Sequence, residues 1–107
     1  MTKYLLLYSG GSMPQSEAEQ KQVIEAWNKW MGSLGKALID GGDPFTPNAM
    51  SVMTDGSTKD GPVGGMMASG YSIIEADSLD AATKMAKGCP VLMGGAKISI
   101  FETFHVM

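Results

Sequence analysis

The amino-acid sequence predicts a single α+β domain spanning residues 1–107, with strands and helices in the order βαββαβ. Three observations predict this class. A chain of this length has room for one hydrophobic core. Short apolar runs bounded by glycines, typical of strands, alternate with two longer amphipathic segments that start at a serine and are typical of helices. The composition, 44% hydrophobic and 18% charged, is that of a globular protein.

The first half of the chain predicts a strand followed by a long helix. Residues 4–8 form a nearly continuous apolar run, which is typical of a strand covered on both faces. Ser16 and Glu19 then have the spacing of a capping box. Apolar residues follow at three- and four-residue steps, and this periodicity predicts a helix over residues 17–39. Two glycines weaken its second half, and the Asp-Gly-Gly-Asp-Pro sequence at residues 40–44 ends it.

The second half predicts three strands and one helix. Residues 49–53 form the second strand, and residues 54–70, rich in Gly, Asp and Ser, form a loop too long for a tight hairpin. Residues 70–76 form the third strand. Ser78 then caps a short helix that stops at a Gly-Cys-Pro sequence. Alternating apolar residues predict the last strand over residues 97–104.

This order of elements predicts a ferredoxin-like fold, in which a four-stranded antiparallel sheet carries both helices on one face. The other face keeps apolar side chains, among them Phe101 and part of the run at residues 4–8. A monomer would expose these side chains as a large apolar patch. We therefore expect a homodimer that forms through this face.

Composition and charge exclude several classes of partner. The net charge of −3, with acids and bases scattered along the chain, argues against nucleic acid, because phosphate backbones need a concentrated basic surface. No apolar run approaches the roughly 20 residues that span a bilayer, and the N-terminus lacks the apolar region of a secretory signal. A single cysteine, Cys89, excludes an internal disulfide and is compatible with a reducing compartment. We expect a cytoplasmic protein without nucleic-acid or membrane partners.

Few residues offer reactive chemistry. His105 is the only histidine, and therefore the one weak candidate for acid–base catalysis near neutral pH. Its position near the terminus favours the alternative, a partly exposed side chain without a catalytic role. Cys89 follows the C-terminal end of a helix, where the helix dipole opposes a thiolate, so we expect a structural thiol.

Several residues are candidates for lining a ligand pocket. Trp27 and Trp30 lie on the apolar stripe of the first helix, which is typical of core residues; an open gap between helix and sheet would make them an aromatic wall. The aspartates of the turns fit no EF-hand loop, and no His/Cys set supplies zinc ligands, so we expect neither a metal nor a cofactor. The candidates are Trp27, Trp30, Asp43, Asp60, Ser72 and the 61–70 part of the loop.

Short motifs along the whole chain resemble the YCII-related family, in its DGPF-domain branch. They are the run from Lys3 to Tyr8, the helix with Trp27 and Trp30, Asp40-Gly41-Gly42-Asp43-Pro44-Phe45, Asp60-Gly61-Pro62, and residues 70–79 and 87–90. The resemblance implies a dimeric α+β barrel of ferredoxin-like fold. It also implies, from some members, isomerase- or lyase-like chemistry on small carboxylated rings.

Two departures from the family pattern bear on catalysis. In the branch considered enzymatic, a histidine on the first helix pairs with an aspartate, and this chain has no histidine between Ser16 and Asp40. The Asp-Gly-Pro-Phe motif reads Asp60-Gly61-Pro62-Val63. The catalytic pair therefore does not carry over, and the resemblance leaves open whether the protein is an enzyme.

Two functions follow from the sequence. The first is binding of a small apolar or carboxylated molecule in a cleft near the dimer-facing side of the sheet. The alternative is a non-catalytic interaction or regulatory module that acts through the loop at residues 54–70. A concave cleft with several convergent polar groups would favour the first, and a filled core with a flat exposed loop would favour the second.

Overall fold

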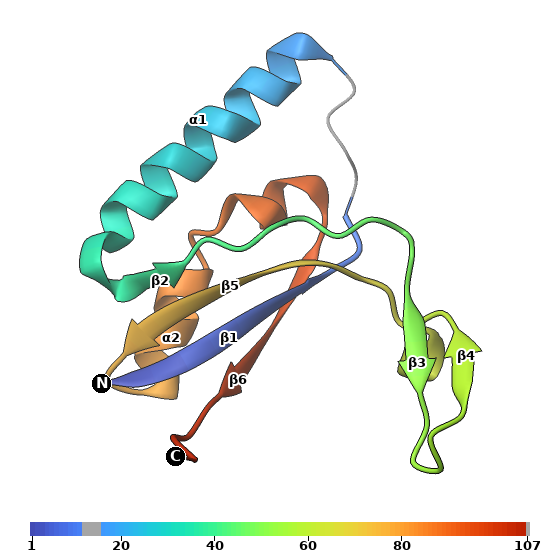
Figure 1. Ribbon diagram of the computed structural model, residues 1–107. Coiled ribbons are helices and arrows are strands. Elements are labelled where there is room, and N and C mark those ends of the chain that lie inside the picture. Colours follow the sequence, from blue (N-terminus) through green and yellow to red (C-terminus); the bar gives the residue numbers. More distant parts are fainter. Residues whose placement is uncertain (12–15, 107) are drawn as a thin grey trace.

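The computed structural model describes residues 1–11 and 16–106 (Figure 1). The chain runs through β1 (Thr2–Ser9), α1 (Glu17–Leu34), β2 (Leu38–Asp40), β3 (Met50–Val52), β4 (Thr58–Asp60), β5 (Ala68–Ala76), α2 (Leu79–Ala86) and β6 (Lys97–Glu102). Short 3₁₀ turns occur at Gly35–Ala37, Val63–Gly65 and Pro90–Gly94. No helix among the described residues is both long and apolar enough to cross a bilayer.

Four of the strands form one antiparallel sheet in the spatial order β2-β5-β1-β6, and β3 and β4 pair with each other in a separate two-stranded sheet. Within the four-stranded sheet the order of the strands is that of a ferredoxin-like fold. Side chains of both helices join the core on one face of this sheet, with α1 crossing it obliquely (Figure 1). The predicted α+β, ferredoxin-like fold is therefore confirmed.

The second strand of the main sheet is not where the sequence predicted it. Residues 49–53 do contain a strand, β3, but its partner is β4, which lies inside the predicted loop. The edge strand beside β5 is instead β2, where Leu38 faces Ile74. The predicted helix over residues 17–39 is too long because Gly35, with a φ of 54°, ends it after Leu34. Apolar periodicity continues through this break because Leu38 packs against the same core from a strand.

The local signals that start the two helices are confirmed. The Ser16 hydroxyl accepts a hydrogen bond from the Glu19 amide at 3.2 Å, and the Ser78 hydroxyl accepts one from the Ala81 amide at 3.1 Å. These caps satisfy amide groups that have no partner inside the helix. The other predicted strands differ only at their ends, since β5 starts at Ala68 and β6 stops at Glu102.

The core lies between the sheet and the two helices. Its buried members come from β1, β5, α1, α2 and the turn after α2: Tyr4, Leu6, Tyr8, Trp30, Ile74, Ala76, Ala82, Ala86 and Cys89. From α1 only Trp30 is buried, and Ile24, nearer the start of the helix, is 58% exposed. The N-terminal half of α1 extends away from the sheet (Figure 1). The helix and the sheet therefore diverge from Trp30 toward the N-terminus of α1.

The face of the sheet turned away from the helices carries the apolar side chains that the sequence placed there. We call Leu5, Leu7, Tyr71, Ile73 and Phe101 the open face. The strand register pairs Leu5 with both Ile73 and Phe101, and Leu7 with Tyr71. Phe101 is 52% exposed. The homodimer expected from this face stays a prediction.

Candidate functional site

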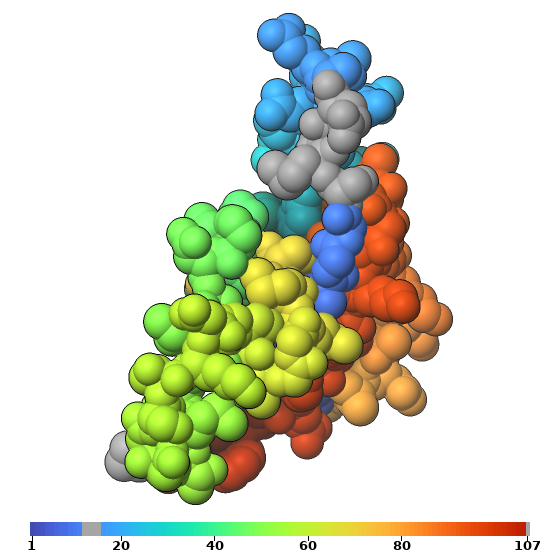
Figure 2. Space-filling model, turned by 90° about the vertical axis from the view of Figure 1, so that its right-hand side faces the viewer, coloured from blue at the N-terminus to red at the C-terminus, as the bar shows by residue number. Residues whose placement is uncertain are grey.

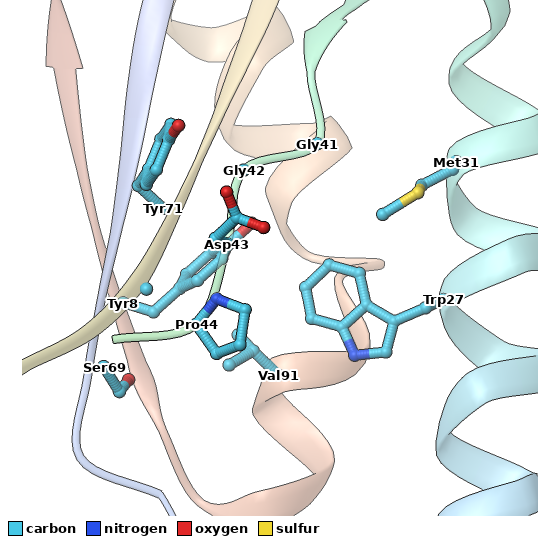
Figure 3. Close-up of a pocket in the computed structure, with 11 residues that line it drawn as sticks. Tyr8, Trp27, Met31, Gly41, Gly42, Asp43, Pro44, Ser69, Tyr71 and Val91 are labelled. Atoms are coloured by element: carbon cyan, nitrogen blue, oxygen red, sulfur yellow. The ribbon is translucent and has the colours of Figure 1, made fainter. Parts of the chain in front are cut away.

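A cavity of about 290 Å³ opens where α1 diverges from the sheet (Figure 3). One wall is formed by Trp27 and Met31 of α1. The opposite wall is the chain that follows β2 together with the start of β5, and Val91 lies between them in the view of Figure 3. The residues that line the cavity are Tyr8, Trp27, Met31, Gly41, Gly42, Asp43, Pro44, Ser69, Gly70, Tyr71 and Val91.

Aromatic rings support the helix side of the cavity. The Trp27 ring contacts Tyr8 edge to face, with centroids 6.0 Å apart, and contacts Trp30 in the same manner at 5.6 Å. Trp30 itself is only 5% exposed, and its indole Nε1 donates to the Met85 carbonyl at 2.9 Å. This hydrogen bond holds α1 against α2. Trp27, one turn earlier, is partly exposed and presents its ring to the cavity.

The opposite wall is held by hydrogen bonds around Asp40 and Gly41. One Asp40 carboxylate oxygen accepts from the Gly42 amide at 2.8 Å, and the other accepts from the Tyr71 hydroxyl at 3.2 Å. The Ser72 hydroxyl donates to the Gly41 carbonyl at 2.9 Å. These contacts fasten the chain after β2 to β5.

The part of this wall that follows β2 lies close to β5 along its whole length. The Phe45 amide donates to the Ser69 carbonyl at 2.8 Å, and the Phe45 ring stacks on Tyr71 with centroids 5.9 Å apart. Gly42 has a φ of 72°, and a Cβ at this position would lie 1.7 Å from the Tyr71 carbonyl oxygen. Only glycine fits here. We call residues 40–45 the pinned segment.

Two polar side chains of the cavity are without protein partners. Asp43 is the only charged lining residue; its side chain is exposed to solvent, and no hydrogen bond to its carboxylate is found among the described residues. Figure 3 shows this carboxylate directed between Tyr71 and Trp27. The Ser69 hydroxyl is buried and has no hydrogen-bond partner. Because this oxygen has almost no surface open to solvent, it lies behind the cavity surface, where a molecule in the cavity does not reach it.

Ser69 owes its position to a β-bulge. Tyr8 pairs with Gly70, and Ser9 pairs with Ala68, so Ser69 has no opposite residue on β1. Bulges often redirect a side chain beside a functional site. The sequence named this residue only as part of the 61–70 loop. No sequence signal could single it out, because the bulge depends on how β5 pairs with β1.

A buried chain of hydrogen bonds lies behind the cavity. Cys89 donates to the Tyr8 hydroxyl at 3.5 Å, Tyr8 donates to the Ser72 hydroxyl at 2.6 Å, and Ser72 donates to Gly41. Burial raises the pKa of the Tyr8 phenol and the pKa of the Cys89 thiol. Both groups therefore keep their protons near neutral pH. These hydrogen bonds connect the core to the pinned segment.

Of the pocket candidates, Trp27, Asp43 and the end of the 61–70 loop, Ser69 and Gly70, line the cavity. Trp30 and Ser72 do not line it but fix the residues that do, through Met85 and Gly41 respectively. Asp60 lies in β4, exposed and outside the cavity. The sequence placed the cleft near the dimer-facing side of the sheet, whereas this cavity lies on the helix side. The difference arises because α1 packs only through its second half.

His105, the weak catalytic candidate, lies outside this cavity. It is exposed beyond the end of β6, in a second depression of about 570 Å³. That depression is lined by Met1, Thr2, Lys3, Glu102, Thr103, Phe104 and His105. Among residues 1–11 and 16–106, no three His, Cys, Asp or Glu side chains are grouped as metal ligands would be.

Comparisons with known proteins agree with this architecture. No family model and no curated protein matches the chain. Among solved structures, it is similar to 5-chloro-2-hydroxyhydroquinone dehydrochlorinase from Burkholderia phenoliruptrix AC1100, in a complex with 2,5-dihydroxybenzoquinone. The TM-score is 0.54 and the identity 19%, over 95% of this chain and 94% of the other. At this identity the likeness concerns the fold, and it supports the YCII-related type of fold that the sequence motifs implied.

Proposed function

We propose that the protein binds a small molecule with a planar, largely apolar ring in the cavity between α1 and the pinned segment. The observation that carries this proposal is the construction of the cavity. Trp27 and Met31 form one side, the pinned segment and the start of β5 form the other, and Asp43, which is exposed, is the only charged residue in the lining. Concave sites with apolar walls and a few polar groups are typical of small-molecule binding.

The size of the cavity and the structural neighbour support a ligand with a single ring. A volume of about 290 Å³ lies at the lower end of the range for ligand pockets. The dehydrochlorinase of similar fold was solved with 2,5-dihydroxybenzoquinone, which has one six-membered ring. A ring of that size could lie against the face or edge of Trp27, where aromatic contacts are favourable.

Nuclear magnetic resonance on the ¹⁵N-labelled protein tests this proposal. The two tryptophans supply two indole N–H signals. The Trp30 indole is bonded to Met85 outside the cavity and serves as an internal control. We expect one-ring compounds to shift the Trp27 signal more than the Trp30 signal.

A helix substitution tests the same point independently. Trp27→Ala should weaken binding about tenfold, because one aromatic contact contributes about 1.4 kcal/mol. Ile24→Ala is the matched control, since Ile24 lies on the same helix, 58% exposed and outside the cavity. Equal affinities for the two variants, or a wild-type protein that binds none of the compounds, would contradict the proposal.

We also propose that two copies associate through the open face. The side chains that support it are Leu5, Leu7, Tyr71, Ile73 and Phe101, which lie on three neighbouring strands. Sedimentation at micromolar concentration should give the mass of two chains. Phe101→Glu should shift that mass toward one chain, and Ile24→Glu should not. A wild-type mass of one chain would exclude the dimer.

One observation favours the alternative function, an interaction or regulatory module. The β3–β4 hairpin and the turn after it form a projecting lobe (Figure 2) whose apolar side chains are exposed, namely Met50, Val52, Met53, Val63 and Met66. Adaptable methionine surfaces suit protein partners. This function predicts that no small molecule moves the Trp27 signal, and that Val52→Asp abolishes binding of a hydrophobic dye to the native protein. Dye binding unchanged in this variant would contradict it.

A further inference from the structure

One side chain crosses the cavity at its narrow end. α1 and the sheet diverge toward the N-terminus of α1, so the gap between them narrows from Trp27 to Met31, one helical turn further along (Figure 3). We propose that Met31 determines the ligand specificity of the cavity. Its thioether closes the narrow end against Gly41 and restricts the ligand to one ring without a long substituent that points inward. This inference rests on the proposed function, because it assumes that the cavity binds a ring.

Met31 reaches from the helix to the opposite wall. A Cβ at Gly41 would lie 3.2 Å from Met31 Cε and 3.7 Å from its Sδ. Apart from the chain neighbours of Gly41, no other atom of the described residues lies within 4 Å of that position. Figure 3 shows the Met31 side chain extending from α1 toward the pinned segment. The thioether end therefore occupies the space beside Gly41, and it is the side chain that bridges the two walls there.

The Gly41 side of this contact is fixed. Its carbonyl accepts from the Ser72 hydroxyl at 2.9 Å, and Ser72 is completely buried. The amide of the next residue, Gly42, donates to Asp40 at 2.8 Å. Moving this wall would leave the buried hydroxyl without its partner, which costs free energy. The width of the gap therefore depends on the residue that faces Gly41 from the helix, which is Met31.

The two adjacent glycines of this wall differ in what opposes a side chain. Gly42 has a positive φ, and its Cβ would overlap the Tyr71 backbone. Gly41 has no positive φ, so its backbone is compatible with an alanine. At Gly41 a Cβ meets only the flexible end of an unbranched side chain, the Met31 thioether. The space beside Gly41 is therefore determined by how far the residue at position 31 extends.

The surroundings of Met31 are apolar. Met31 is partly buried and packs against the core, as Leu34 and Leu38 do. A shorter residue at this position would therefore lengthen the cavity by apolar space, which suits an alkyl group. A hydroxyl on the opposite edge of the same ring keeps its hydration when it points out of the cavity, because burial without a partner is costly. Together these preferences orient a ring with its alkyl group toward Met31.

Ligands of increasing length test this inference. Phenol, 4-ethylphenol and 4-propylphenol are titrated against the ¹⁵N-labelled protein, and the Trp27 indole signal reports binding. In the wild type, each added CH₂ should improve affinity by less than about twofold, because Met31 leaves it no buried space. In Met31→Ala, each CH₂ should improve affinity about fourfold, the value for full burial. Phenol itself should bind to this variant about threefold more weakly, because its ring loses contact with the thioether.

Three further variants control this experiment. Met66→Ala removes a methionine that is 72% exposed and outside the cavity, so it should behave as the wild type does. Met31→Leu keeps most of the side-chain volume but has no atom that reaches as far as Cε, so its gain per CH₂ should be intermediate; it replaces Met31→Ala if that variant does not fold. Gly41→Ala added to Met31→Ala should reduce the gain, because its Cβ occupies part of the vacated space. The amide spectrum shows whether each variant is folded.

The outcomes separate this inference from the proposed function. A nuclear Overhauser effect between the Met31 Cε methyl group and the Gly41 α-protons should be observed, and its absence would exclude the contact. The inference is also wrong if the gain per CH₂ is unchanged in the Met31 variants, if it rises equally in Met66→Ala, or if Met31→Ala weakens all three phenols alike. In each of these cases the cavity still binds rings. If no phenol binds to any of the proteins, the proposed function itself fails.

Discussion

Gly42 is the position at which the fold and the cavity depend most directly on one residue. It has a φ of 72°, and a Cβ there would lie 1.7 Å from the Tyr71 carbonyl oxygen and 2.7 Å from its carbon. Gly56, in the turn between β3 and β4, has a similar φ of 89° but no atom within 4 Å of such a Cβ. Substitution by alanine therefore costs the same backbone free energy at both glycines. The two positions differ only in the close approach of Tyr71 to Gly42.

The expected loss of stability follows from these contacts. An alanine with positive φ costs about 1–2 kcal/mol, and this is the whole penalty for Gly56→Ala. In Gly42→Ala the chain must also retreat from Tyr71 by at least about 1 Å, because a Cβ is essentially never found closer than 3.0 Å to another heavy atom. That movement weakens the hydrogen bonds at Asp40 and Gly41 and adds about 2–4 kcal/mol.

Urea unfolding followed by tryptophan fluorescence measures this difference, and circular dichroism shows whether each variant is folded. Gly42→Ala should lose at least about 2 kcal/mol more than Gly56→Ala, which corresponds to a Tm lower by about 8 °C or more. It should also bind one-ring compounds more weakly, because it displaces the wall that carries Asp43. Equal stability losses in the two variants would refute the close approach of the pinned segment to β5.

Three further predictions concern the buried groups around the cavity. Trp30→Phe should cost about 1–3 kcal/mol because this buried side chain loses its hydrogen bond to the Met85 carbonyl and part of its volume, whereas Trp27→Phe should cost less than about 1 kcal/mol, as urea unfolding would show. Cys89 should react slowly with iodoacetamide at neutral pH and rapidly in urea, because burial raises the pKa of its thiol; fast labelling of the native protein would contradict this. Burial also raises the pKa of Tyr8 above its ordinary value of 10.0, so above pH 10 the unfolded chain releases a proton that the folded chain keeps. The free energy of unfolding should then fall with rising pH by up to about 1.4 kcal/mol per unit from this residue, and a fall of the same slope in Tyr8→Phe would exclude it.

Local signals in the sequence were sufficient to predict most of the fold. The serine caps depend on residues three apart, and the strand patterns depend on alternation within a few residues, so both can be recognised in one chain. The second strand was predicted wrongly because the position of the apolar residue Leu38 in the sequence is compatible with both a helix and a strand. It continues the helical periodicity of α1, yet it packs on the core from β2. The backbone turn at Gly35 decides between them, and glycine within a helical pattern only hints at such a turn.

The cavity could be predicted only in part. Trp27 was recognised as a residue that an open gap would expose, and Asp43 was named among the pocket candidates, but no local pattern says whether the gap is open. Ser69 could not be identified, because its place in the cavity lining depends on a bulge between distant strands. Asp60 was included for its motif, and it lies in a hairpin that the main sheet does not contain. Contacts between remote segments decide all of these placements.

The cavity has a physical origin in the spacing of the two tryptophans. Trp30 anchors α1 to the core through its burial and its bond to Met85. Trp27 lies three residues earlier, almost one helical turn, which places it on the same side of the helix but 4.5 Å nearer its N-terminus by the rise of about 1.5 Å per residue. The helix diverges from the sheet on the N-terminal side of Trp30. The Trp30 side chain therefore lies in the core, whereas the Trp27 side chain, one turn earlier, lies at the edge of the cavity. A bulky ligand ring on Trp27 would therefore extend the packing of the core, and its binding should stabilise the N-terminal half of α1.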